Sequence, residues 1–107
     1  MRGLVDRIRT LISAGEVRIS EHGYDEMTDD DLAARELITG VLEAIVIEES
    51  LDYPKGPCIL VLQRDKTGDP VHVVWGIPKG YEKPAVLVTA YRPNPDQWDN
   101  SFLQRRR

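Results

Sequence analysis

The chain of 107 residues contains one cysteine, so Cys58 cannot form a disulfide within the chain. Long hydrophobic runs are also missing, because no stretch approaches the roughly 18 apolar residues that cross a bilayer. Residues 1–13 are interrupted by charged side chains and do not resemble a secretory signal peptide. These absences predict a soluble cytoplasmic protein with no membrane partner.

A basic excess is missing as well, since the formal net charge is −4. Proteins that bind nucleic acid usually carry a basic excess, because neutralising phosphates supplies much of their affinity. The acids cluster in residues 25–31 and again at Glu48 and Glu49, whereas bases gather near the start and in residues 105–107. This distribution excludes a strongly basic protein but leaves room for a local basic face.

Several signature motifs of enzymes are absent. The sequence has no GxGxxG, P-loop or GxSxG, which argues against dinucleotide binding, nucleoside triphosphate binding and serine hydrolase chemistry. It has no HExxH spacing, and the acidic run 29–31 lacks the glycine and late glutamate of a calcium loop. We expect no metal and no cofactor. The acids are better explained as helix capping, with Thr28 and Asp31 forming a capping box.

The remaining pattern predicts a single domain over residues 1–107, with its core in about residues 4–98 and a flexible tail over 99–107. Apolar residues recur at helical spacing over 4–14 and 31–44, and a short helix begins between them with Ser20 as its N-cap. Residues 17–20 alternate and are compatible with a short edge strand. The main strands are expected at residues 44–53, 58–65, 70–79 and 84–92.

Helices come first in this order and strands follow, joined by short hairpin loops. That order predicts an α+β fold with N-terminal helices packed on one face of a four-stranded, mainly antiparallel sheet. Trp98 and Phe102 lie after the last strand and are expected to fold back onto an exposed apolar edge.

His72 interrupts an otherwise hydrophobic strand, at a position where a valine would be expected. Its side chain suits proton transfer near neutral pH, although a histidine satisfied by a neighbouring carbonyl or side chain is the alternative. A four-residue loop at 66–69 would place Gln63 opposite His72, and the next hairpin would place Tyr91 on its other side. These three residues would form a polar row on the more open face of the sheet. A slip of one residue in either loop would dissolve the row.

His22 lies at the start of the short helix, four residues before Glu26, so both side chains are expected on one helical face. It is a candidate catalytic group, with a capping or surface role as the alternative. Arg64 and Arg92 lie at one end of the predicted sheet and are candidates for holding a phosphate.

Four segments together resemble the small bacterial domain-of-unknown-function family 4258, over roughly Val17 to Trp98. They are ISEHGYDEM around His22, PKGPCILVLQRD, PVHVVWGI around His72, and VLVTAYRPNPDQW. The family's helix-then-sheet layout is similar to that of RelE-like toxins, which are small ribonucleases that cut messenger RNA, often on the ribosome, and are neutralised by an antitoxin. The resemblance implies a toxin-like ribonuclease with RNA or the ribosome and an antitoxin-like protein as partners. The sequence departs from the family pattern at Glu26, where many members have an arginine.

Two functions of different classes remain open. The first is a metal-independent endoribonuclease, in which a base deprotonates a ribose hydroxyl and an acid protonates the leaving oxygen. The second is a non-catalytic interaction module that meets a basic partner through its acidic helical segment or dimerises through an open sheet face. For the first function, the candidate catalytic residues are His72, His22 and Tyr91, and the candidate substrate-binding residues are Arg64, Arg92 and Gln63.

Overall fold

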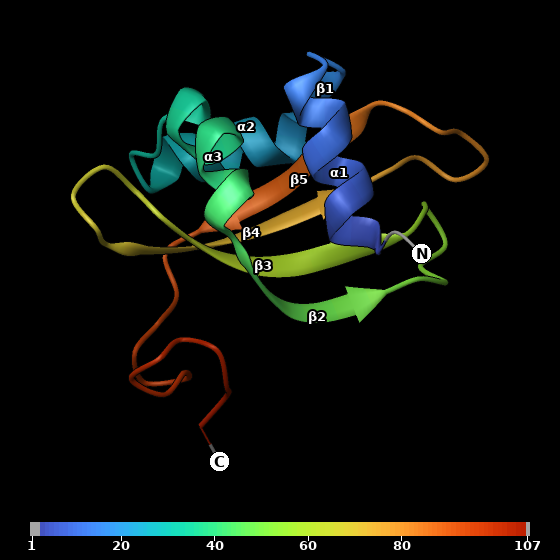
Figure 1. Cartoon of the computed structure of the whole chain (residues 1–107). Coiled ribbons are helices and arrows are strands. Elements are labelled where there is room, and N and C mark those ends of the chain that lie inside the picture. The colour runs from blue at the N-terminus through green and yellow to red at the C-terminus, as the bar shows by residue number, and fades with distance from the viewer. Residues whose placement is uncertain (1–2, 107) are drawn as a thin grey trace.

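The computed structural model describes residues 3–106 as an α+β fold in which three α-helices cover one face of a five-stranded mixed sheet (Figure 1). The strand order is β1-β5-β4-β3-β2. The elements are α1 (Leu4–Ser13), β1 (Val17–Ile19), α2 (Glu21–Asp29), α3 (Ala34–Gly40), the 3₁₀ turn η1 (Val41–Glu43), β2 (Ile45–Ser50), β3 (Cys58–Arg64), β4 (Pro70–Gly76) and β5 (Ala85–Tyr91).

The sheet has one strand more than expected. Strands β2 to β5 form the predicted antiparallel neighbours, while β1 joins the opposite edge in parallel with β5. Backbone bonds from Ala85 to the Glu16 carbonyl and from Ser20 to the Leu87 carbonyl extend that pairing. The short edge strand considered at residues 17–20 is confirmed as β1, but three residues carry too little pattern to predict its parallel pairing with β5.

The second helix begins as expected, because the Ser20 hydroxyl accepts a hydrogen bond from the Gly23 amide at 2.9 Å. Gly23 has a packing role in addition. A Cβ at this position would lie 2.9 Å from the Leu87 carbonyl oxygen. The missing side chain therefore lets α2 approach β5 closely, which offsets the low helix propensity of glycine.

The third helix is shorter than the expected 31–44, and the predicted capping box is wrong. Thr28 lies inside α2, where its hydroxyl donates to the Tyr24 carbonyl, and the residue before α3 is Ala33, which makes no side-chain cap. Asp31 adopts a positive φ of 53°, and the Leu32 amide then bonds to the Met27 carbonyl. This left-handed turn ends α2 and redirects the chain into α3.

The hydrophobic core lies between the helices and one face of the sheet, where Trp75 is the largest fully buried side chain. Arg9 also contacts this layer, although its side chain is partly exposed. Its Nε donates to the Val41 carbonyl at 3.0 Å and its Nη2 to the Ala44 carbonyl at 2.8 Å. Arg9 therefore ties α1 to the end of η1 through two backbone carbonyls.

The register of the β3–β4 hairpin differs by one residue from the expected one. Leu62 pairs with His72, and Gln63 pairs with Val71. The loop has five residues because Asp65 remains outside the strand pairing: its carboxylate accepts from the Thr67 and Asp69 amides. A one-residue shift moves every side chain of a strand to the other face. The prediction that Gln63 lies beside His72 in a polar row is therefore wrong. The predicted pairing of His72 with Tyr91 is confirmed.

The chain after β5 lies on the side of the sheet away from the helices (Figure 1), where Trp98 packs against His72. Residues 97–106, called the C-terminal strap below, contain one isolated bridge between Trp98 and Arg105. Flexibility of the tail in solution stays a prediction, and Arg107 lies outside the described residues. No helix within residues 3–106 has the length and apolar character needed to cross a membrane.

Candidate functional site

His72 lies in the middle of β4 and is completely buried beneath the C-terminal strap. The Trp98 ring contacts it edge-on with a centroid distance of 4.4 Å, and the Tyr91 ring lies 5.6 Å away. Its Nε2 is 2.8 Å from the Phe102 carbonyl oxygen. The side chain is thus enclosed by the strap and β5, and the open face expected around it is covered.

The surroundings of His72 fix its protonation state. A carbonyl oxygen only accepts hydrogen bonds, so Nε2 carries the proton and Nδ1 is left as an acceptor. That Nδ1 is buried without a hydrogen-bond partner. Burial lowers the pKa of His72 and the charge of Arg105 lowers it further, while the bond to the Phe102 carbonyl opposes both. The imidazole is therefore neutral near pH 7 and has one unused lone pair.

Tyr91 stands beside His72 on β5 and is partly buried. Burial raises its pKa, Arg105 opposes that rise and Glu48 adds to it. The phenol therefore stays protonated and is a hydrogen-bond donor. A neutral base next to a neutral acid is a suitable pair for proton transfer, but in this conformation the strap separates His72 from solvent.

The strap is held to the sheet by several contacts. Arg105 lies 4.8 Å from the centre of the Trp98 ring and forms an ion pair with Glu48 on β2. Within the strap, the Asp99 amide bonds to the Gln104 carbonyl and the Arg106 amide to the Gln97 carbonyl. An open cavity of about 410 Å³ lies between the strap and β2. It is lined by Ile47, Glu48, Trp98, Leu103, Gln104 and Arg105.

Gln63 lies on the helix side of the sheet, where its buried side chain makes two hydrogen bonds. The Trp75 indole donates to its Oε1 at 2.8 Å, and its Nε2 donates to the Leu37 carbonyl at 2.8 Å. Both bonds satisfy groups that would otherwise be buried without partners. Gln63 therefore joins α3 to the core, and the structure does not bring it to His72.

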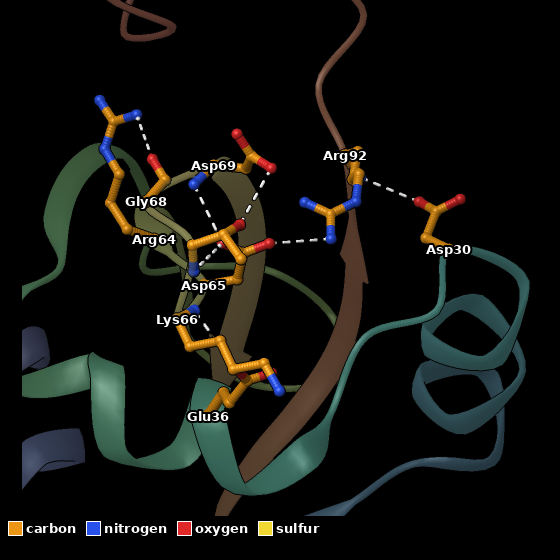
Figure 2. Close-up of polar contacts among 9 residues, drawn as sticks. Asp30, Glu36, Arg64, Asp65, Lys66, Gly68, Asp69 and Arg92 are labelled. Carbon is orange, nitrogen blue, oxygen red and sulfur yellow. Dashed lines mark hydrogen bonds and ion pairs between the residues drawn. The ribbon is translucent and has the colours of Figure 1, made fainter.

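Arg64 and Arg92 lie at the same end of the sheet, beside the 65–69 loop (Figure 2). Arg64 donates to the Gly68 carbonyl at 3.2 Å, and Arg92 forms an ion pair with Asp65 at 2.9 Å. A hydrogen bond from the Thr67 hydroxyl is the largest cause that holds the pKa of Asp65 far below its usual value. Asp65 therefore remains ionised and keeps Arg92 engaged.

Acidic side chains surround these two arginines. The Asp30 carboxylate accepts the Arg92 backbone amide at 2.9 Å, and the Glu36 carboxylate accepts the Lys66 amide at 3.3 Å (Figure 2). Asp69 accepts a hydrogen bond from the Thr67 hydroxyl in the same loop. Like charges disfavour an incoming anion, so the local field at this end of the sheet works against phosphate binding.

His22 lies on α2 with 66% of its side chain exposed, and its Nε2 is 3.7 Å from a Glu26 carboxylate oxygen. The expected common face of these two residues is confirmed. Because α2 covers the helix side of the sheet, the sheet separates His22 from His72. The three candidate catalytic residues therefore do not share one cleft: His72 and Tyr91 lie together, and His22 does not.

Metal ligands do not gather anywhere in residues 3–106, since no three His, Cys, Asp or Glu side chains form such a group. Cys58, at the start of β3, is partly buried, and burial raises the pKa of its thiol. A thiol with a raised pKa has little thiolate at neutral pH and is a poor nucleophile.

The exposed edge of β2 is a feature that sequence reasoning missed, although the strand itself was expected at residues 44–53. Its outer edge pairs with no strand of the described chain, 3–106. Five of the seven large hydrophobic residues that are exposed among these residues lie in β2 or within three residues of its ends. They are Leu42 (59%), Ile45 (51%), Val46 (36%), Leu51 (64%) and Tyr53 (48%). The continuous apolar run at residues 44–47 was the only sequence feature that could have indicated an exposed apolar edge. The same pattern is equally typical of a buried strand.

A comparison with protein families supports the resemblance of the four segments. A family model described as Domain of unknown function (DUF4258) matches residues 19–92. The chain matches no curated protein and no solved structure. Because the family match covers more than half of the 107 residues, the protein belongs to the DUF4258 family.

Proposed function

We propose that this protein is a non-catalytic interaction module that recruits an extended segment of a partner protein onto the free edge of β2. The observation that supports this function most directly is the cluster of exposed apolar side chains along an edge strand. An unpaired edge offers a row of backbone donors and acceptors, and added strands bind through them.

The energetics of this edge favour occupation. Ile45 and Val46 lie on opposite faces of β2, because Ile45 pairs with Leu62 and Val46 with Val61. An added strand would cover both faces at once. Completely burying an aliphatic side chain contributes about 1.5–3 kcal/mol, so covering two half-exposed ones supplies on the order of 2 kcal/mol beyond the backbone hydrogen bonds.

The other candidate surfaces support binding less well. His72 is buried, and Arg92 is already paired with Asp65. In the 65–69 loop the Thr67 and Asp69 amides and the Thr67 hydroxyl already donate to the Asp65 carboxylate, so these donors are not available to a ligand. Of the surfaces compared, the outer edge of β2 therefore has the most unpaired backbone groups and exposed apolar side chains.

The test is co-purification of the tagged full-length protein from its native cells at native expression. The Ile45→Lys variant places a charge on the exposed edge, and Tyr81→Lys is the matched control because Tyr81 is exposed in the loop between β4 and β5. We expect a stoichiometric partner with wild type and Tyr81→Lys, and its loss with Ile45→Lys. Retention of the partner by Ile45→Lys, or a wild-type particle with the mass of one chain, would contradict the proposal.

A second candidate function is a metal-independent endoribonuclease of the RelE-like type. The specific observation in its favour is the adjacent pair of His72 and Tyr91, with a buried His72 Nδ1 that has no partner. In this function His72 takes the proton of the ribose hydroxyl and Tyr91 supplies one to the leaving oxygen. The C-terminal strap must move for RNA to reach them.

This second function predicts activity that rises when the strap is loosened. Trp98→Ala removes the ring that covers His72 and should increase RNA cleavage measured in the presence of a metal chelator. Adding His72→Gln to that variant should abolish cleavage while circular dichroism shows a retained fold. Cleavage that persists in the double variant would remove His72 from the mechanism.

A further inference from the structure

We infer that the segment recruited by β2 is basic and that it displaces Arg105 of the C-terminal strap from Glu48. This inference rests on the proposed function and specifies the partner's chemistry and a regulatory consequence. Binding at the edge of the sheet would thereby release the strap that covers His72.

The charge of the edge indicates the class of partner. Residues 36–54 contain five acidic residues and no lysine or arginine. Side chains on neighbouring strands lie about 4.5–5.5 Å apart, so each acid of β2 faces a residue of the added strand directly. On β2 the apolar residues Ile45 and Val46 come first and the acids Glu48 and Glu49 follow. Opposite charges at facing positions stabilise the pairing, which favours an extended segment whose apolar residues face 45–46 and whose basic residues face 48–49.

The same charges disfavour a second copy of this chain on the edge. Pairing β2 with itself would bring Glu48 and Glu49 of both chains into one narrow zone, flanked by Glu43 and Asp52. Like charges on facing strands are destabilising. The sequence of β2 therefore combines an apolar surface that attracts a partner with acids that oppose self-association.

The strap already places an arginine on this edge. Glu48 pairs with Leu60, so its side chain lies on the strap side of the sheet, and Arg105 forms an ion pair with it. The same guanidinium covers the Trp98 ring, which in turn packs on His72. If an arginine of the partner forms an ion pair with Glu48, Arg105 loses its own ion pair with Glu48. One of the contacts that hold the strap on the sheet is then lost.

The coupling has a limited size because the ion pair is exposed. Such pairs change an equilibrium by about 0.2–1 kcal/mol, which corresponds to roughly 1.4- to 5-fold in affinity. The competition is therefore visible as a change of a fewfold in binding and as a shift in strap opening.

The probes are two fluorescent seven-residue peptides, in which a block of valines is joined to a block of arginines in one and to a block of glutamates in the other. The arginine peptide should bind the full-length protein and the glutamate peptide should not. Arg105→Gln should raise the affinity for the arginine peptide by about two- to fivefold, because the internal competitor is gone. Glu48→Gln should lower the affinity and abolish the effect of Arg105→Gln.

Release of the strap is measured by hydrogen exchange. The Asp99 and Arg106 amides are bonded within the strap, and their exchange should accelerate when the arginine peptide is added. Equal binding of both peptides, or unchanged exchange of these amides at saturation, would overturn the inference. Peptide binding that Ile45→Lys does not weaken would do so as well, because the peptide would then be bound elsewhere.

The outcomes separate this inference from the proposed function. If the native partner is lost with Ile45→Lys but Arg105→Gln leaves peptide affinity unchanged, edge recruitment stands and the competition is wrong. If light scattering shows a dimer that Ile45→Lys dissociates, the occupant is a second copy and the basic partner is wrong. Retention of the native partner by Ile45→Lys instead contradicts recruitment itself.

Discussion

The two faces of the sheet are covered in different ways. Three helices cover one face with a continuous apolar core, in which Trp75 and its neighbours are completely buried. The opposite face is covered by the ten-residue strap, which rests on a histidine and is held by an ion pair at the surface. The helix-covered face thus forms the structural core. The strap on the other face makes so few contacts that they can be broken without unfolding the core.

The largest expected effect tests the helix-covered face. Trp75→Ala leaves a cavity in the core and also removes the indole bond to Gln63. Replacing a buried tryptophan by alanine ordinarily costs about 3–5 kcal/mol, so the free energy of unfolding from denaturant titration should fall by that amount. A loss below about 1 kcal/mol would show that this face is not the main core.

Trp98→Ala makes the corresponding change on the strap-covered face. The ring packs on His72 and beneath Arg105, but its cavity opens toward solvent on the side of the strap. We expect a smaller loss, about 1–3 kcal/mol. We also expect hydrogen exchange to accelerate in residues 97–106 but not in the core strands. A loss as large as that of Trp75→Ala, with global acceleration of exchange, would erase the difference between the two faces.

Acidification should loosen the strap-covered face through His72. Burial lowers its folded pKa below the unfolded value, so the neutral form stabilises the fold fully above about pH 6.5. That stability is lost as the pH falls from about 6.5 through the lowered folded pKa. The groups that face the imidazole are Tyr91 and Arg105, and Arg105 lowers its pKa as well.

The measurement is the free energy of unfolding between pH 7 and pH 5 in a His22→Gln background, which leaves His72 as the only histidine. Stability should decrease by up to about 1.4 kcal/mol for each unit by which the pKa is lowered. Adding His72→Gln should flatten that dependence. If the slope survives the second substitution, another group is responsible.

The core side was more accessible to sequence reasoning than the strap side. Helical and strand periodicity placed the main helices and the four antiparallel strands, because the residues that alternate there are the ones that pack. The pairing of His72 with Tyr91 was predicted from an assumed loop length, and a register shift between Val74 and Trp75 is part of how the strands reach it. Gln63 went to the wrong face because the Asp65 carboxylate bonds to two amides in the loop and adds a residue to it.

The remaining features of the site depend on contacts between distant segments. Nothing in the local pattern of residues 97–106 indicates that Arg105 reaches Glu48, or that the Phe102 carbonyl reaches His72. Exposure of Ile45 and Val46 likewise follows from the position of β2 at the edge, which is a property of the strand order. Chain periodicity carries no information on either point.

The smallest expected effect concerns the ion pair that joins the two features of the second face, the strap and β2. Arg105→Gln and Glu48→Gln each remove one partner of an exposed pair, so each should lower the free energy of unfolding by no more than about 1 kcal/mol. Arg105→Gln should cost more than Glu48→Gln, because Arg105 also covers Trp98. In a double-mutant cycle the second substitution should add less than it does alone, since the pair is already broken. Strict additivity would mean that the two side chains do not interact in solution, and the strap would then be held by Trp98 and the Phe102 carbonyl alone.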